Sequence, residues 1–348
     1  MEVKPTKLLL PVSWLYGSII MIRNLLFDQG LLQQWKAEVP VISVGNITTG
    51  GTGKTPLVEN LVRYLLSQGK RIAVLSRGYK RDGSGPVYIA PGIQNRGNSL
   101  ILGDEPYQMA RKFPQIAVLV DANRKRAAEL ASKKYHAQVI ILDDGFQHRA
   151  LNRDLNIVMV DRSIQLEKMP LLPAGMLREP VTVLKRAHVI AYIGSSDGNE
   201  REQSSSKNSK PSITVVRHPV KFHSMQAGIE CSIADSKGKR CIAFCGIGKP
   251  ESFKRSLESI GLEVCKMIVF PDHHYFTDVD LKNIRSEFIK YQPDWVVTTE
   301  KDASRIDSVM AGLLPKNVSY YLEIEAVIND GAEMLHAMIQ NILKDTNG

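Results

Sequence analysis

Apolar runs of strand length alternate with helix-length segments between residues 41 and 194. Six of these runs, rich in Val, Ile and Leu, span 41–45, 71–76, 115–121, 138–144, 156–161 and 187–194. Such runs are typical of strands buried in a parallel sheet. Between the first two, apolar residues recur at helical spacing from Leu57 to Leu66, and Gly69 ends the segment. The alternation predicts βαβ units, and therefore a parallel sheet covered by helices.

The pattern changes after residue 194 and later resumes. Residues 195–212 are polar, Ser-rich and without periodicity, which predicts a loop, whereas 213–222 have the composition of a strand. A second α/β series follows, with strand-like runs at 240–248, 263–270 and 294–302 and helical segments at 250–261 and 278–290. We therefore expect two α/β domains, divided near residues 215–235.

The N-terminus carries an uncharged apolar run from Leu8 to Ile22. The run is shorter than the roughly 20 residues that span a bilayer as a helix, and no small-residue cleavage site follows it. Lys4 and Lys7 precede it, and Trp14 lies within it. This arrangement favours a helix that lies in a membrane interface with its apolar side in lipid. The alternative is a helix that packs on the core of the protein itself.

Composition limits the class of protein and of partner. The chain has 348 residues, of which 43% are hydrophobic and 23% charged, and its formal net charge is +9. These values are typical of a globular protein with an anionic partner. The four cysteines lack paired CxxC spacing, so neither a zinc site nor a disulfide framework is indicated. Nucleic acid is not favoured as a partner, because no recognition helix, RNA-binding aromatic pattern or zinc module is evident.

A Gly- and Thr-rich loop follows the first predicted strand and precedes the first predicted helix. In a P-loop, glycines let backbone N–H groups converge on phosphates, Lys contacts the β and γ phosphates, and Ser or Thr binds Mg²⁺. Lys54 and Thr55 fill the last two roles. The strict motif has Gly at position 48, where this chain has Thr48. The predicted nucleotide-binding residues are Thr48, Thr49, Gly50, Gly51, Thr52, Gly53, Lys54, Thr55 and Pro56.

A pair of acidic residues ends the strand at 138–144. Asp143 and Asp144 stand where parallel strands open onto a site, so they are candidates for holding the metal of the P-loop. An acidic pair at a strand end can also simply form a turn. Nucleotide-driven switches fit less well, because residues 298–303 do not match Asn-Lys-x-Asp and Thr49 replaces the signature Lys of the membrane ATPases.

Seven motifs occur in an order that resembles the tetraacyldisaccharide 4′-kinase family of lipid A biosynthesis. They are GNITTGGTGKTP, LSRGYKR, GDEP, DDGFQH, LREP, DHHYF and TTEKDA, between residues 45 and 303. The resemblance implies a P-loop NTPase-like α/β/α sandwich and a second, smaller α/β/α domain, joined by a small β linker. The expected parts are a membrane-associated helix (1–30), the P-loop domain (31–215), the linker (216–234) and the second domain (235–348). The C-terminal helix is free to pack back on the first domain.

The resemblance also implies an activity. Members of the family use ATP and Mg²⁺ to phosphorylate the 4′-hydroxyl of a tetraacyldisaccharide 1-phosphate, a lipid A precursor. The implied location is the cytoplasmic face of the bacterial inner membrane, peripheral or monotopic, with no protein partner evident. Two alternatives remain at this stage: a soluble P-loop kinase for a small metabolite, and a nucleotide-gated ATPase switch at the membrane.

The motifs also carry roles for individual residues. Lys54 and Thr55 become ligands of phosphate and metal, and Asp143 and Asp144 the metal-binding pair. Asp104 of GDEP matches the candidate catalytic base of the family, and His273 of DHHYF the histidine that assists it; alternatively, Asp104 is only a helix cap. Closing a cleft between the two domains would bring His273 to Asp104. Candidates for contact with the substrate, or for support of the residues that contact it, are Arg77, Arg124, His148, Arg178 and Glu179.

Overall fold

The computed structural model describes residues 6–50, 53–78, 81, 85–92, 99–194, 210–226 and 228–344. One continuous sheet of 13 strands runs through this part of the chain. The strands are β1 (Val41–Asn46), β2 (Ile72–Ser76), β3 (Val87–Ile89), β4 (Ala117–Val120), β5 (Val139–Asp143), β6 (Leu155–Asp161), β7 (Val189–Ile193), β8 (Ser212–Ser224), β9 (Glu230–Ser232), β10 (Arg240–Cys245), β11 (Glu263–Val269), β12 (Trp295–Thr299) and β13 (Ser319–Asp330). Their order is β11-β10-β12-β13-β8-β7-β6-β1-β5-β2-β4-β3, with β9 paired to β8.

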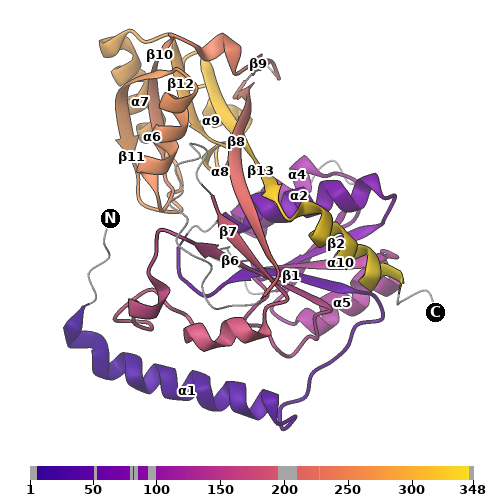
Figure 1. Cartoon of the computed structure of the whole chain (residues 1–348). Helices are drawn as coiled ribbons and strands as arrows, with labels where there is room; N and C mark the ends of the chain where they lie inside the picture. Colours follow the sequence, from indigo (N-terminus) through magenta and orange to yellow (C-terminus); the bar gives the residue numbers. More distant parts are fainter. Residues whose placement is uncertain are drawn as a thin grey trace.

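The helices cover this sheet in two lobes (Figure 1). They are α1 (Leu10–Asp28), α2 (Lys54–Ser67), α3 (Ser99–Leu102), α4 (Asp104–Lys112), α5 (Arg124–Lys133), α6 (Pro250–Ser259), α7 (Asp278–Tyr291), α8 (Glu300–Ala303), α9 (Ser308–Ala311) and α10 (Ala332–Lys344). The short 3-10 helices are η1 (Lys7–Leu9), η2 (Leu166–Lys168), η3 (Val181–Arg186) and η4 (Ala234–Ser236).

The first lobe is a three-layer α/β/α sandwich around parallel strands. β7, β6, β1, β5, β2 and β4 pair in parallel in that order, and all six lie within or next to the apolar runs that predicted them. Helices α2, α4 and α10 pack apolar side chains on one face. Helix α5 packs on the other face, as does a segment that contains η2 and η3. The carboxyl ends of the central strands therefore open together onto one edge of the sheet.

The second lobe repeats the sandwich on a smaller scale. β11, β10 and β12 are parallel, with α6 contributing to the core on one face and α7 to the core on the other. Phe253 and Leu257 of α6 are buried, as are Leu281 and Ile284 of α7. The lobe thus has α/β layers of its own on its part of the sheet, as the alternation after residue 240 predicts.

Two long antiparallel strands connect the lobes. β8 pairs with β13 from Tyr320 opposite Ser224 to Asp330 opposite Thr214, and the two strands extend from one lobe to the other (Figure 1). The expected linker, 216–234, contains only part of the first of these strands. After β13 the chain returns to the first lobe, where Leu335 and Ile339 of α10 are buried in the same core as Leu61.

Helix α1 lies along the first lobe with its polar side inward. Ser13 and Asn24 are buried, whereas Trp14 and Leu15 are 71% and 65% exposed, and Leu8 of the preceding η1 is 88% exposed. This finding contradicts the alternative in which the apolar side packs on the core of the protein. Residues 7–28 form 22 helical residues that are long and apolar enough, by length and composition, to cross a membrane. The short apolar run is therefore not by itself an argument against spanning.

Bonds along the helix tie it to the lobe. The Ser13 hydroxyl donates to the Leu171 carbonyl at 3.0 Å, the Tyr16 hydroxyl to the Arg178 carbonyl at 2.8 Å, and Arg23 to the Gln147 carbonyl at 2.7 Å. These contacts extend over about three helical turns. A helix held along its length on the face of a globular lobe presents only its other side to a membrane.

Candidate active site

The P-loop stands between β1 and α2, as the sequence predicts. Backbone pairing fixes its first half, since the Thr49 amide donates to the Met176 carbonyl at 2.8 Å and Thr48 bridges Leu177. Gly53 caps α2 with φ +73°, a left-handed conformation that glycine adopts without strain. Lys54, Thr55 and Pro56 form the first turn of α2, where N–H groups and the helix dipole favour an anion. Gly51 and Thr52 lie outside the described residues.

Lys54 points toward the acidic pair. Its Nζ lies 3.2 Å from Oδ1 of Asp144 and 3.3 Å from Oδ1 of Asn46, the last residue of β1. Asp144 also accepts from Arg178 at 2.8 Å through Oδ2. Although burial raises the pKa of Asp144, the charges of Lys54 and Arg178 lower it below its usual value. The strand-end acid and the P-loop lysine, separated by 90 positions in the chain, thus share one site.

Asp143 has a different environment. It ends β5 beside Val44 of β1 and is 4% exposed. Burial, with repulsion from Glu105 and Asp144, raises the pKa of Asp143 to about 7, although Lys54 opposes the rise. Within the described residues, its Oδ1 has no hydrogen-bond partner. A buried carboxylate oxygen without a partner fits a hard cation such as Mg²⁺.

The donor set suits Mg²⁺ that is held together with a nucleotide. The described part of the chain contains no group of three or more His, Cys, Asp or Glu side chains arranged to hold a metal ion. Mg²⁺ is commonly bound by one or two carboxylates plus substrate phosphates, and does not need a complete protein cage. Asp143, Asp144 and the Thr55 hydroxyl would supply such a partial set.

The predicted substrate residues near this centre differ in burial and in contacts. Arg124 is 4% exposed and donates to the main-chain carbonyls of Ser76 and Asp121. Burial, reinforced by the charge of Arg77, lowers the pKa of Arg124 to about 10 even though Asp143 opposes this shift. Arg77 follows β2 and is exposed to solvent. Arg124 is therefore a buried group near the acidic pair, and Arg77 is an exposed one.

His148 and Glu179 lie on the side of the site that faces α1. Burial and the charges of neighbouring arginines, Arg124 first, lower the pKa of His148 to about 4, so its ring is neutral at pH 7. Glu179 is fully buried and forms an ion pair with Arg186. Asn24 of α1 donates to the same carboxylate at 3.4 Å. Glu179 therefore connects the loop that carries Arg178 to α1.

Asp104 is held by the second lobe. It is the first residue of α4, but the N-cap is Gly103. Its Oδ2 accepts from His273 Nδ1 at 2.8 Å and from Arg305 at 2.7 Å. Burial raises the pKa of Asp104, but the hydrogen bonds from His273 and Arg305 outweigh it and hold the pKa at about 2. The carboxylate is thus ionised and bound across the lobes, which a helix cap alone does not explain.

Two arginines near these groups were not expected from the sequence. Arg305 lies two residues after the TTEKDA motif. This position next to a motif is the feature of the sequence that could have indicated Arg305 as a site residue. Arg217 of β8 lies over the P-loop, because a β-carbon built on Gly53 would be 3.7 Å from its Cδ. No local pattern marks a residue that reaches a site from a distant strand.

The parallel sheet, the glycine-rich strand–loop–helix unit and the acidic strand end beside its lysine define a P-loop nucleotide-binding protein. A family model described as tetraacyldisaccharide-1-P 4′-kinase matches residues 5–344. The chain belongs to this family.

Relatives match over nearly their whole length. The chain is 33% identical to the tetraacyldisaccharide 4′-kinase of Bdellovibrio bacteriovorus, over 96% of this chain and 98% of the relative. It is 37% identical to that of Chlorobaculum tepidum, over 97% of both chains. A crystal structure of LpxK from Aquifex aeolicus in complex with ATP superposes with a TM-score of 0.77. That protein is 34% identical, over 96% of this chain and 98% of its own. The predicted family and fold class are confirmed.

Proposed function

We propose that this protein transfers the γ-phosphoryl group of ATP to the 4′-hydroxyl of a tetraacyldisaccharide 1-phosphate, a precursor of lipid A. The observation that carries the proposal is that the chain matches the family model over residues 5–344. The molecule also contains two groups of residues that suit the reaction, which we call the phosphate half and the acceptor half of the site. Lys54 and Asp144 form the phosphate half in the first lobe. Asp104 and His273 form the acceptor half where the lobes meet.

At the phosphate half, catalysis is electrostatic. Lys54 and the amides at the start of α2 would bind the β and γ phosphates and stabilise the charge that shifts between them during transfer. Thr55, Asp143 and Asp144 would hold Mg²⁺. When bound, that ion supplies further neutralisation of the phosphate oxygens. Arg178, which bonds Asp144 at 2.8 Å, would keep this carboxylate in its orientation.

At the acceptor half, Asp104 would receive the proton of the attacking hydroxyl. The new bond joins the 4′-oxygen to the γ-phosphorus, the bond from that phosphorus to the bridging oxygen breaks, and ADP leaves. A pKa of about 2 makes Asp104 a weak base. A weak base is compatible with phosphoryl transfer, because a loose transition state needs little proton removal before the hydroxyl attacks. His273 would orient the carboxylate from the second lobe.

The remaining groups suit an anionic glycolipid. Arg77, Arg124 and His148 surround the centre, and Arg178 and Glu179 connect it to α1. We assign Arg77 to contact with the lipid headgroup because it is exposed, and the buried Arg124 and Glu179 to supporting roles. The formal net charge of +9 also favours an anionic substrate.

The exposed apolar side of α1 would lie in the cytoplasmic face of the bacterial inner membrane, as a peripheral or monotopic attachment. Trp14, Leu15 and Ile19 are on this side, while the opposite side is bonded to the lobe. A lipid acceptor anchored in the same membrane would then reach the site without leaving the bilayer surface.

The proposal is tested with the full chain, γ-labelled ATP, Mg²⁺ and the disaccharide with a free 4′-hydroxyl in mixed detergent micelles. We expect labelled lipid, and a loss of about 10²–10³ in rate for Lys54→Ala because one preorganised contact to the phosphates is removed. Release of phosphate without labelled lipid would favour the ATPase switch, and labelling of soluble sugars alone would favour a metabolite kinase. Either result would reject the proposal.

A further inference from the structure

Arg305 is a fully buried arginine at the junction of the two lobes. It follows α8, and its side chain is 0% exposed. One terminal nitrogen donates to Oδ2 of Asp104 at 2.7 Å. The other donates to Oδ1 of Asp302 at 2.8 Å and to the Gly246 carbonyl at 3.1 Å. The guanidinium group therefore bridges one carboxylate from each lobe.

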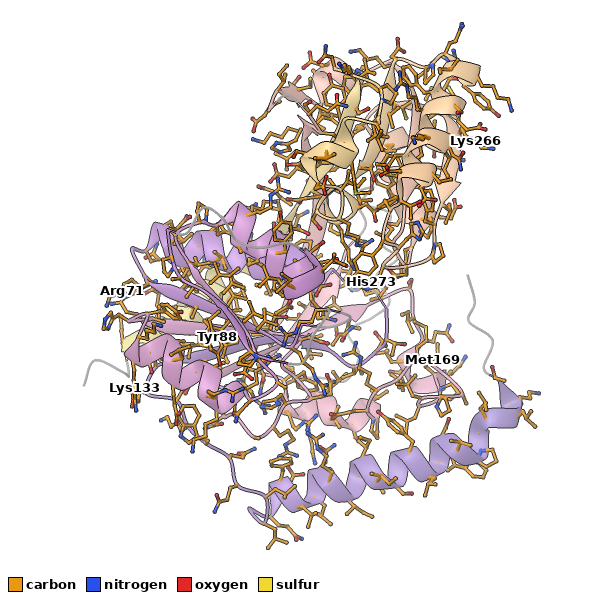
Figure 2. The ribbon with its side chains drawn as sticks, turned by 180° about the vertical axis from the view of Figure 1, so that it is seen from behind. Arg71, Tyr88, Lys133, Met169, Lys266 and His273 are labelled. Atoms are coloured by element: carbon orange, nitrogen blue, oxygen red, sulfur yellow. The ribbon has the colours of Figure 1, made fainter. Side chains whose placement is uncertain are left out.

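The second-lobe end of this bridge is itself immobilised. Asp302 is 0% exposed and its Oδ2 accepts from the Gly246 amide at 3.1 Å and the Thr299 hydroxyl at 2.6 Å. The Gly246 carbonyl also accepts from the backbone amide of His273 at 3.1 Å. Arg305 and His273 are thus held by the same group of hydrogen bonds in the second lobe, and both donate to Asp104. Figure 2 shows His273 at the end of the second lobe that faces the first.

The two oxygens of Asp104 are used unequally. Arg305 and His273 both bond Oδ2, whereas Oδ1 is buried and has no hydrogen-bond partner within the described residues. An ionised carboxylate oxygen that is buried without a partner is costly unless a ligand supplies the bond. The hydroxyl group of the substrate that accepts the phosphoryl group can donate this hydrogen bond.

We propose that Arg305 is a positioning residue for the transfer, which holds Asp104 by Oδ2 so that Oδ1 is directed at the acceptor hydroxyl. This inference rests on the proposed role of Asp104 as the proton acceptor. The planar guanidinium of Arg305 is itself held by the buried carboxylate of Asp302. It therefore sets the direction of the Asp104 carboxylate more strictly than a single ammonium donor can.

The charges around Asp104 determine how the loss of Arg305 would be observed. Arg305, His273 and Lys301 favour the ionised carboxylate, and burial opposes it. The acidic groups nearby are Glu105 on α4, which lies 4.0 Å from Lys301, Asp302 beside Arg305, and Asp272 beside His273. Without the Arg305 charge, burial and these acids would raise the pKa of Asp104.

The test compares Arg305→Lys, Arg305→Met and Asp302→Asn by the pH dependence of kcat/KM for the lipid. For Arg305→Met we expect a loss of about 10²–10³ in kcat, by analogy with removal of one preorganised donor. We also expect an acid limb at higher pH than in the wild type, because Asp104 then protonates more readily. Arg305→Lys should recover part of the rate and show a smaller displacement of the acid limb. Binding of ATP, measured by calorimetry, should be unchanged.

Asp302→Asn is the matched structural control. It weakens the same bridge at the second-lobe end but leaves the Arg305 charge beside Asp104, so its acid limb should stay at the wild-type pH. If Arg305→Met and Asp302→Asn lose thermal stability and activity equally, with an unshifted pH profile in both, Arg305 is only structural and the inference is wrong. A wild-type rate for Asp104→Ala would instead overturn the proposed role of Asp104, which separates the two failures.

Discussion

Asp104 shows how one residue can belong to two lobes at once. Its backbone begins α4 in the first lobe, while its carboxylate is bonded by His273 and Arg305 of the second. The proposed proton acceptor is therefore correctly oriented only when both lobes are in the arrangement seen here. If Asp104 is the proton acceptor, Asp104 and His273 should therefore act as a single functional unit.

We expect Asp104→Ala and His273→Ala each to lower kcat far more than KM for ATP, because neither side chain lies at the phosphate half of the site. The double variant should be little worse than the more severe single variant, since groups that act as a unit behave non-additively. Steady-state kinetics of the three variants measure this. Losses that multiply would mean that the two residues act independently. A wild-type rate in Asp104→Ala with a lower Tm would reduce Asp104 to a structural role.

The residues of the phosphate half were accessible from sequence, because a strand, a loop and a helix in succession fix Lys54 relative to β1. Asp143 and Asp144 follow from the rule that neighbouring parallel strands end at one edge. The approach of His273 to Asp104, across 169 positions, was expected only through the family resemblance. Arg305 and Arg217 were missed, since burial and long-range contact leave no local pattern.

At the scale of elements, α1 is a helix with its polar residues turned inward. Asn24 illustrates this, because it contacts Glu179 and Arg186 in the first lobe while Ile19 and Met21 are 57% and 65% exposed. The apolar residues are the exposed ones, which fits the predicted helix with its apolar side in lipid and not the alternative of a core helix. The sequence did not show which polar residues turn inward, because Leu171 and Glu179, which Ser13 and Asn24 contact, lie far along the chain.

We expect Trp14→Ser combined with Leu15→Asn to weaken binding to anionic vesicles without lowering Tm, because both side chains are largely exposed. Sedimentation with vesicles and thermal unfolding measure the two properties. Asn24→Leu is the control on the inward side. It should lower Tm, because its partners Arg186 and Glu179 lose a bond, and leave vesicle binding intact. Unchanged vesicle binding in the double variant would exclude α1 as the membrane contact.

Most strands and helices could be predicted from apolar periodicity, with boundaries displaced by a few residues. β13 was not predicted, although its twelve residues form the second connecting strand. Its side chains alternate imperfectly, since it carries glutamates that face a buried cluster of charges and not solvent. Glu323, for example, is 6% exposed. A charged residue in a strand normally predicts the side that faces solvent. Here the prediction fails, because the glutamates face inward and pair with charged residues of other elements.

At the scale of the molecule, a buried cluster of charges joins the lobes. Lys112 of α4 lies 2.9 Å from Glu59 of α2, 3.4 Å from Glu300 of α8 and 2.6 Å from Glu323 of β13. Hydrogen bonds from His223 and Lys112 lower the pKa of Glu323 to about 2, against the effect of burial. Burial raises the pKa of Glu300 to about 7 even though Lys112 opposes it. One ammonium group thus holds three carboxylates from separate elements.

We expect Lys112→Met to destabilise the protein by about 3–5 kcal/mol, because it removes the cation that lies closest to the buried Glu59 and Glu323. Arg63 lies farther away, at 3.6 Å from Glu59 and 3.9 Å from Glu323, and replaces Lys112 only in part. The stability of the wild type and that of the variant should change with pH in opposite directions. In the wild type, the contribution of Glu323, whose pKa is lowered to about 2 on folding, is present above its unfolded pKa and is lost as pH falls. In the variant, carboxylates with raised pKa values should make the protein less stable as pH rises. Urea unfolding at several pH values measures both trends, and Lys112→Arg is the charge-preserving control. A Lys112→Met variant as stable as the wild type would show that the cluster does not couple the lobes.

The sequence predicts two α/β units and the position of the P-loop, since each depends on local periodicity. It does not predict that one sheet continues through both units, because that depends on β8 and β13 pairing across about a hundred intervening residues. Nor could it fix where α10 packs, since an amphipathic helix with Leu335 and Ile339 on one side fits either lobe equally well.

The central claim is that the acceptor is the 4′-hydroxyl of a lipid A precursor. It is tested most directly with two disaccharide 1-phosphate lipids that differ only in bearing a 4′-hydroxyl or a 4′-deoxy carbon. Each is incubated in mixed micelles with the full chain, Mg²⁺ and γ-labelled ATP, and the extracted lipid is counted. We predict label in the hydroxyl lipid and none above background in the deoxy lipid. Equal labelling of both lipids, or label found only in inorganic phosphate, would contradict the account.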